Sequence, residues 1–246
     1  RGVVTCRCRR PAAAPLQHQF PARPNLDALL AARGYLVYSV LYHDSLFVSV
    51  NEACYSDLQY LRGFFVGYDS IMGVAKAQDE DCRGMDKRFG NLVFMLGTRA
   101  NHSSELLPNP GKACQVATVE CRIAFCLTVE NLLGRMTGCS SHLTNDHVPT
   151  AQSQATAYRN FAVGYAPSSL RWIAGDFNLT IGQVPPAYGN NHVLMNYGYT
   201  VNPRATLNKQ IDHVWWRSPP VTLNYLPAFC PPDASDHCLV ETELVV

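Results

Sequence analysis

Apolar and polar positions alternate along several segments of this chain, which is the pattern of β-strands. The clearest alternation covers residues 115–130, where apolar side chains recur at every second position and Glu120, Arg122, Thr128 and Glu130 lie between them. This pattern predicts a half-buried strand of an antiparallel sheet, with the charged residues facing solvent. Further strands are expected to end at Glu52 and to lie near residues 192, 211, 221 and 238.

Three other segments have the composition and spacing of helices. Leucines after Asn25 form an apolar face and predict a short helix over residues 26–33, which ends at Gly34. A second helix is expected at about residues 55–65. The polar, alanine-rich segment at 151–164 predicts an amphipathic helix that precedes another strand.

The length and composition of the chain favour one large, turn-rich domain. Its 246 residues can bury a substantial core, and the sequence contains no internal repeat. Residues 1–25 are rich in Arg, Pro and Ala without periodicity, so we expect a poorly ordered N-terminal arm followed by a single domain over 26–246. No apolar stretch approaches the roughly 18 residues that span a bilayer, which excludes an integral membrane protein with spanning helices.

Ten cysteines in a chain of this size indicate an oxidising compartment and a secreted protein. The sequence contains no pair of Cys-x-x-Cys motifs, which is the pattern that would predict a zinc module. Cys54 follows Glu52 and Cys82 precedes the strand that contains Gly90, so these two cysteines are expected to form one disulfide. Cys126 and Cys139 lie on consecutive strand-like segments and are expected to form another. The alternative is that some cysteines are small core residues. The start at Arg1 without a signal peptide is consistent with a processed, exported chain.

Polar clusters lie at the ends of two of the predicted strands. Asp176 and Asn178 come directly after the apolar run at 172–174, and two residues of separation at a strand end allow both side chains to face one ligand. Asp236 and His237 precede another strand-like run and offer a carboxylate beside an imidazole. Polar groups that meet at strand ends are the arrangement that a hydrolytic site on a sheet sandwich requires.

Further candidate residues occur at other strand ends: Glu52, Asn91 in Arg88-Phe89-Gly90-Asn91, His142 in Ser141-His142-Leu143, and Asp212 in Ile211-Asp212-His213. Read in order, the set resembles the endonuclease/exonuclease/phosphatase superfamily of deoxyribonuclease-like, sphingomyelinase-like and inositol-phosphatase-like hydrolases, over residues 45–243. The resemblance implies an α+β fold, a four-layer α/β/β/α sandwich of two mainly antiparallel sheets flanked by helices. It also implies a metal-dependent phosphoesterase.

The resemblance assigns a role to each of these residues. Glu52 is the principal ligand of Mg²⁺ (or Mn²⁺ or Ca²⁺), assisted by Asp236. A divalent cation neutralises charge that develops on the phosphoryl oxygens, and Mg²⁺ needs only one or two carboxylates. Asp176 orients or deprotonates the attacking water. The others act on the phosphate and its protons: Asn178 holds a phosphoryl oxygen or the water, His237 is the acid/base, Asp212 fixes the tautomer of His237, His142 donates to the phosphate, and Asn91 contacts the substrate.

Each residue also has a structural alternative. Glu52 can cap the following helix, His142 can be a buried histidine bonded to backbone, and Asp212 can be a turn residue. Asn91 is equally compatible with contacting phosphate and with satisfying a strand end. His213 is expected to be a packing neighbour.

The N-terminal segment departs from the superfamily pattern. The first strand normally ends in an Asn that contacts the metal or the phosphate, and Arg7 stands at that position. A guanidinium only donates hydrogen bonds and competes with a cation for a carboxylate. A binding protein with weakened catalysis is therefore an alternative function.

The substrate is not specified by the sequence. A net charge of +1 is a weak electrostatic signal for nucleic acid. The leading interpretation is a secreted, monomeric phosphodiesterase with DNA or RNA as its substrate, and a phosphomonoesterase or sphingomyelinase-like hydrolase is the alternative. Two segments match the N-glycosylation pattern, Asn101-His102-Ser103 and Asn178-Leu179-Thr180. We expect Asn178 to be unmodified, because a glycan there would block the site.

Overall fold

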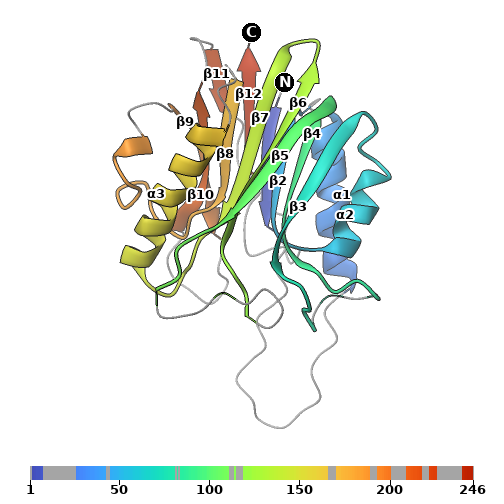
Figure 1. Cartoon of the computed structure of the whole chain (residues 1–246). Helices are drawn as coiled ribbons and strands as arrows, with labels where there is room; N and C mark the ends of the chain where they lie inside the picture. Colours follow the sequence, from blue (N-terminus) through green and yellow to red (C-terminus); the bar gives the residue numbers. More distant parts are fainter. Residues whose placement is uncertain are drawn as a thin grey trace.

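The structure of this protein is a computed structural model. It describes residues 2–7, 26–42, 45–80, 82, 84–110, 114, 119–165, 170–188, 193–200, 209–217, 222–225 and 240–245. The elements, in chain order (Figure 1), are β1 (Gly2–Arg7), α1 (Leu26–Tyr42), β2 (Phe47–Cys54), α2 (Tyr55–Arg62), β3 (Tyr68–Lys76), β4 (Phe89–Leu96), β5 (Thr98–Leu106), β6 (Ile123–Asn131), β7 (Gly134–His142), α3 (Val148–Tyr165), β8 (Leu170–Asp176), β9 (Val193–Thr200), β10 (Lys209–Arg217), β11 (Thr222–Tyr225) and β12 (Val240–Val245).

The strands form two six-stranded sheets. Sheet A has the order β11-β12-β1-β2-β4-β3, and sheet B has the order β5-β6-β7-β8-β10-β9. Neighbouring strands are antiparallel except for two parallel pairs, β1 with β2 and β7 with β8. The predicted α+β architecture with two mainly antiparallel sheets is therefore confirmed.

Three groups of buried apolar side chains hold the layers together. One group, which includes Phe47, Met95 and Trp172, fills the space between the two sheets. A second group packs the outer face of sheet A against α1 and α2, and a third packs the outer face of sheet B against α3. Figure 1 shows the helices on the two outer sides, so the layers run helix, sheet, sheet, helix.

Strand β6 is buried on both faces, which corrects the prediction of a half-buried strand at 115–130. Every residue from Ile123 to Val129 is buried. Phe125 and Leu127 face the inter-sheet core, while Ala124 and Cys126 face α3. The sequence showed one apolar face, but small side chains on the other face are also covered because a helix packs over them.

Residues 2–7 form strand β1 rather than part of a poorly ordered arm. β1 lies in the interior of sheet A and pairs with β12 on one side and β2 on the other. Arg7, the last residue of β1, is the register partner of Asn51. Six residues are too few for a periodicity signal, whereas ladder hydrogen bonds to two neighbours stabilise even a short central strand. The remainder of the predicted arm, residues 8–25, lies outside the described residues.

The first helix is longer than predicted, because α1 continues through Gly34 to Tyr42. A glycine inside a helix costs about 1 kcal/mol, and burial of Leu36 and Val40 against sheet A offsets this cost. α3 covers the predicted segment at 151–164. None of the helices in the described ranges is long and apolar enough to cross a membrane.

Both predicted disulfides are present. Cys54 is bonded to Cys82, and Cys126 is bonded to Cys139, its direct register partner across the β6–β7 hairpin. A third disulfide, Cys114–Cys121, was not anticipated. Disulfides of this number are typical of proteins from an oxidising environment.

Candidate functional site

Three of the predicted site residues lie side by side on adjacent strands of sheet B. His142 ends β7, Asp176 ends β8, and these two residues are register partners. Asp212 on β10 is the register partner of Asp176 on its other side. All three are buried. Asp212 is thus a strand residue rather than a turn residue.

The three side chains face the space between the two sheets. Trp172 and Ala174 on β8 belong to the inter-sheet core, and so do Val214 and Trp216 on β10. Successive side chains on a strand point to opposite faces, so Asp176 and Asp212 share the inner face with these core residues. The row formed by His142, Asp176 and Asp212 therefore places ionisable groups at one end of the inter-sheet core.

Gly175 makes the close contact between β7 and β8 possible. It adopts φ 141°, and a Cβ at this position would lie 1.9 Å from the carbonyl oxygen of Ser141. No other residue is compatible with both the dihedral and the contact. Asp176 beyond it is then held in register with His142.

The chain turns sharply after Asp176. The Oδ1 atom of Asp176 accepts a hydrogen bond of 2.9 Å from the backbone amide of Asn178, which has φ 51°. The Nδ2 group of Asn178 donates to the carbonyl oxygen of Leu143 at 2.8 Å, and the amide of Leu143 donates to the carbonyl of Asp176 at 2.9 Å. These bonds tie the loops after β7 and β8 together beside the row.

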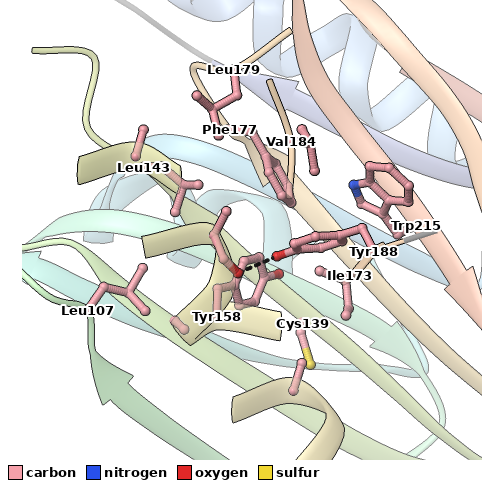
Figure 2. Close-up of a cluster of buried hydrophobic side chains, with 14 of the residues drawn as sticks. Leu107, Cys139, Leu143, Tyr158, Ile173, Phe177, Leu179, Val184, Tyr188 and Trp215 are labelled. Atoms are coloured by element: carbon pink, nitrogen blue, oxygen red, sulfur yellow. Dashed lines mark hydrogen bonds between the residues drawn. The ribbon is translucent and has the colours of Figure 1, made fainter. Parts of the chain in front are cut away.

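Phe177 anchors the same turn in the outer core of sheet B. Figure 2 shows its ring among the aromatic side chains of Tyr158, Tyr188 and Trp215. The hydroxyl of Tyr158 on α3 donates to the carbonyl oxygen of Ala174 at 2.9 Å. Helix α3 and the outer core thus fix the end of β8 on the outer face of sheet B, while Asp176 faces the space between the two sheets.

Glu52 reaches the row from sheet A. A register shift between Val50 and Ala53 places Glu52 in a bulge of β2, with φ 54°. Its backbone amide donates to the Oδ1 atom of Asn91 on β4 at 3.1 Å. The Oδ1 atom of Asn91 therefore satisfies the backbone amide in the bulge of β2.

Glu52 is not the cap of α2. The N-cap of this helix is Cys54, whose backbone amide donates to the Asp57 carboxylate at 2.7 Å. A bulge redirects a side chain that would otherwise follow the strand alternation. The carboxylate of Glu52 is consequently directed toward sheet B instead of toward the helix.

The ring of His142 lies between two carboxylates from different sheets. Its Nδ1 atom is 3.6 Å from the Oε1 atom of Glu52, and its Nε2 atom is 3.4 Å from the Oδ2 atom of Asp176. Both distances exceed those of good hydrogen bonds but are within the range of charge interactions. The partners of His142 are side chains, which distinguishes it from a histidine bonded only to backbone.

Arg122 is a member of this cluster that the sequence analysis placed on a solvent-facing side. Its Nη1 group lies 3.0 Å from the Nδ1 atom of His142 and 2.7 Å from the Oε1 atom of Glu120. A guanidinium has donors only, so Nδ1 of His142 accepts and the ring proton resides on Nε2, toward Asp176. Arg122 precedes β6, where the strand alternation no longer determines the side-chain direction.

His213 lies on the opposite face of β10, as expected of a packing residue. It is fully buried, stacks edge-on against Phe177, and bonds through Nε2 to the carbonyl oxygen of Leu179 at 2.7 Å. Burial lowers the pKa of His213 below its usual 6.5, and this effect outweighs the opposing effects of Leu179 and Asp212. His213 is therefore neutral at pH 7.

Asp236 and His237 lie outside the described residues. In the described part of the chain, no group of three or more His, Cys, Asp and Glu side chains is arranged to hold a metal ion. The donor chemistry at Glu52 nevertheless fits a hard divalent cation. Its side chain is about one-eighth exposed, and Mg²⁺ is bound by one or two carboxylates with water completing its shell.

The sequence has no match among protein-family models and no similarity to a curated protein. The fold, in contrast, matches solved structures of the endonuclease/exonuclease/phosphatase family over the full chain. One is mannosyl-6-phosphatase Bt3783 of Bacteroides thetaiotaomicron, at 16% identity and a TM-score of 0.68, covering 100% of this chain and 99% of that chain.

Two further structures give the same result. An endonuclease/exonuclease/phosphatase family protein, also from Bacteroides thetaiotaomicron, is 16% identical with a TM-score of 0.69, covering 99% of this chain and 94% of that chain. D. rerio TDP2, solved with a single-strand DNA product, is 15% identical with a TM-score of 0.66, covering 100% of this chain and 98% of that chain. The superfamily fold predicted from the motifs is therefore confirmed.

Proposed function

We propose that this chain is a secreted, divalent-metal-dependent phosphoesterase that hydrolyses a P–O bond with an activated water, and that it is a phosphodiesterase acting on nucleic acid. The observation that carries the proposal is the convergence of Glu52, His142 and Asp176 from two sheets at one end of the inter-sheet core. This juxtaposition of carboxylates and an imidazole suits general acid–base chemistry on a phosphate ester.

Glu52, assisted by Asp236, would hold the cation. When bound, a divalent cation supplies charge neutralisation at the phosphoryl oxygens. The bulge of β2 and the hydrogen bond that the Glu52 amide donates to Asn91 hold Glu52 beside His142, so its carboxylate is positioned before the substrate arrives. Preorganisation of this kind removes a reorganisation cost from the reaction.

Asp176 would orient or deprotonate the attacking water. One of its oxygens already accepts the amide of Asn178, and the other faces the Nε2 atom of His142. Asn178 would hold a phosphoryl oxygen or the water. The Nε2–H group of His142 would donate to a phosphoryl oxygen, since Arg122 occupies its Nδ1 atom. His237 would serve as acid/base, and Asp212 would fix its tautomer.

A substitution experiment tests this function. Asp176→Asn and His237→Ala should each lower phosphoester hydrolysis by at least ~100-fold without changing the thermal unfolding midpoint. Glu130→Gln is the matched control, because Glu130 is an exposed carboxylate at the far end of the β6–β7 hairpin and pairs with Arg135. Chelation should abolish the activity of the unmodified protein. Full activity in both site variants, together with insensitivity to chelator, would refute the proposal.

The substrate class is decided by a parallel assay with magnesium on plasmid DNA, RNA, sphingomyelin and inositol phosphates. The fold is shared with a phosphatase and with a protein solved with a DNA product, so both classes are candidates. Preferential cleavage of DNA or RNA supports the phosphodiesterase proposal. Cleavage of phosphomonoesters or sphingomyelin alone assigns the chain to the alternative class.

A binding protein with weakened catalysis is the second candidate, and the position of Arg7 favours it. The end of β1 lies in register with Asn51, the residue before Glu52. A fixed positive charge there competes with a cation for Glu52 while still attracting phosphate. If Arg7 impairs catalysis, Arg7→Asn should tighten magnesium binding and raise turnover. If the variant instead loses turnover, Arg7 is a working phosphate ligand and this second candidate fails.

A further inference from the structure

The two glycosylation motifs of the chain lie in opposite structural environments. Among all asparagines of the sequence, only Asn101 and Asn178 are followed by the required Ser or Thr two residues later. One lies on an open strand and the other in the candidate site. The protein therefore has two glycosylation motifs, and the fold has room for a sugar at only one of them.

Asn178 is incompatible with a glycan in the folded protein. The atom that would carry the sugar is Nδ2, and this atom donates to the carbonyl oxygen of Leu143 at 2.8 Å. The residue is partly buried, and its left-handed backbone is fixed by the bond from its amide to Asp176. A sugar on Nδ2 would replace one of its two hydrogens and would need space at the point where the loops after β7 and β8 are bonded together.

Asn101 has the opposite properties. It lies on β5, it is exposed, and its Oδ1 atom accepts the amide of His102 at 2.8 Å. In the part of the chain that the structure describes, its Nδ2 group makes no hydrogen bond. Asn101 and Ser103 lie opposite Thr128 and Cys126 in register, so they share the outer face of sheet B. A sugar on Nδ2 would extend into solvent without displacing any contact.

β5 is also an edge strand with an exposed surface. It is the edge strand of sheet B, it is nine residues long, and eight of the nine are exposed. Residues 100–104 contain no Asp, Glu, Lys, Arg or Pro. Charges, proline and bulges are the usual features that prevent an edge strand from pairing with another chain. Only the bulge between Arg99 and Asn101 is present in this part of β5.

We propose that Asn101 carries an N-linked glycan and that this glycan shields the open edge of β5 from pairing with other chains. The donor is a lipid-pyrophosphate-linked oligosaccharide, supplied with its transferase by a eukaryotic secretory pathway, the oxidising compartment that the disulfides require. The Nδ2 atom forms a bond to the anomeric carbon of the first sugar, the bond from that carbon to the phosphate oxygen breaks, the lipid pyrophosphate leaves, and one amide proton is released.

The glycan would leave the candidate site open. Asn101 is opposite Thr128, which pairs with Thr137 on β7, and His142 lies five residues farther along that strand. Five strand residues span about 16 Å. The shielding and the phosphoesterase chemistry are thus separate properties of sheet B, and one can fail without the other.

Expression of the full chain behind a secretion signal in a eukaryotic host tests the modification. Glycopeptide mapping of secreted and cell-retained protein should find one glycan on Asn101. Ser103→Ala should remove it, as judged by intact mass, while Thr180→Ala, which destroys the other motif, should leave the mass of the glycan unchanged. An unmodified Asn101, or a glycan on Asn178 of folded protein, would overturn the assignment.

Light scattering tests the shielding. Enzymatic removal of the glycan from folded protein should raise self-association several-fold, and Ser103→Ala should behave like the deglycosylated protein. Adding Ala100→Lys to the Ser103→Ala variant should restore a monodisperse protein, because a charge on an edge strand opposes pairing. If deglycosylated and glycosylated protein remain equally monodisperse, the glycan does not protect the edge.

Discussion

Arg122 is within hydrogen-bond distance of the ring of His142, with its Nη1 group 3.0 Å from Nδ1. Its donation to Nδ1 of His142 leaves the ring proton on Nε2, which faces Asp176. Removing such an orienting partner typically costs 10–100-fold in activity. We therefore expect Arg122→Ala to lower kcat by at least ~10-fold and to let the ring populate its other tautomer, which ¹⁵N NMR of His142 detects.

Arg135→Ala is the control for this substitution. Arg135 also pairs with a glutamate on the β6–β7 hairpin, but it is exposed and distant from the site. The Arg135→Ala protein should retain full activity, because Arg135 is distant from the site and its exposed ion pair contributes little to stability. An Arg122→Ala protein with unchanged kcat and an unchanged His142 spectrum would show that the arginine is merely a neighbour.

His213 should make stability depend on pH. Burial lowers its pKa in the folded state below 6.5, so the unfolded chain takes up the proton first as the pH falls. The stability that neutral His213 contributes is therefore present above about pH 6.5 and is lost as the pH falls through the lower folded-state pKa.

Urea unfolding at a series of pH values, with chelator present throughout, measures this effect. His213→Gln should be less stable than the unmodified protein at pH 7.5 but should lose less further stability on acidification. His147→Gln, at an exposed position, should keep the full pH dependence. Equal acid sensitivity in the His213→Gln and unmodified proteins would contradict the prediction.

At the scale of elements, the Cys54–Cys82 disulfide connects the end of β2 to the loop before β4. Cys54 lies two residues after Glu52 and caps α2, and the bond closes a separation of 28 residues. The Cys114–Cys121 disulfide closes a separation of only 7 residues. Longer closed loops restrict the unfolded chain more, which predicts losses of roughly 3–4 and roughly 2–3 kcal/mol respectively on replacing each cysteine pair by serine.

Of these two replacements, the first should also weaken binding of magnesium, because the Cys54–Cys82 disulfide fixes the strand end that carries Glu52. Chemical denaturation gives the stabilities and a metal titration gives the affinities. Peptide mapping under non-reducing conditions is the direct check on connectivity. Free alkylation of all ten cysteines, or equal loss of magnesium affinity in both variants, would be the contrary result.

At the scale of the whole molecule, the two ends of the chain meet in the middle of sheet A. β1 lies between β2 and β12, so its ladder bonds to β12 join the N-terminal to the C-terminal part of the protein, and its bonds to β2 connect it to the rest of sheet A. Proline in a central strand removes such a bond. Val4→Pro should therefore lower the thermal unfolding midpoint well below that of the unmodified protein.

Ala100→Pro provides the comparison, because Ala100 lies in the bulge of an exposed edge strand. This variant should unfold within a few degrees of the unmodified protein. Thermal unfolding of both variants distinguishes a central strand from an arm. If Val4→Pro is as stable as Ala100→Pro, residues 2–7 do not hold the sheet together.

The sequence alone determined the features that local chemistry encodes. At a strand end, the run of apolar residues stops and a polar residue follows. This pattern made Asp176, Asn178 and His142 recognisable as neighbours of one site. Cysteines next to such strand ends predicted two of the three disulfides found among the described residues. The same motifs indicated the superfamily fold, because a set of short signals in a fixed order is far more specific than any one of them.

Tertiary structure decided what depends on contacts between distant segments. The burial of β6 on both faces follows from α3 packing on it, and the position of β1 follows from two neighbouring strands, neither of which leaves a local pattern. Arg122 joined the site because its side chain is directed by His142 and Glu120 rather than by strand alternation. The direction of side chains repeats every two residues along a strand and every 3.6 residues along a helix, so a sequence pattern describes one element at a time. A site forms where several elements meet, and only the packed chain specifies that geometry.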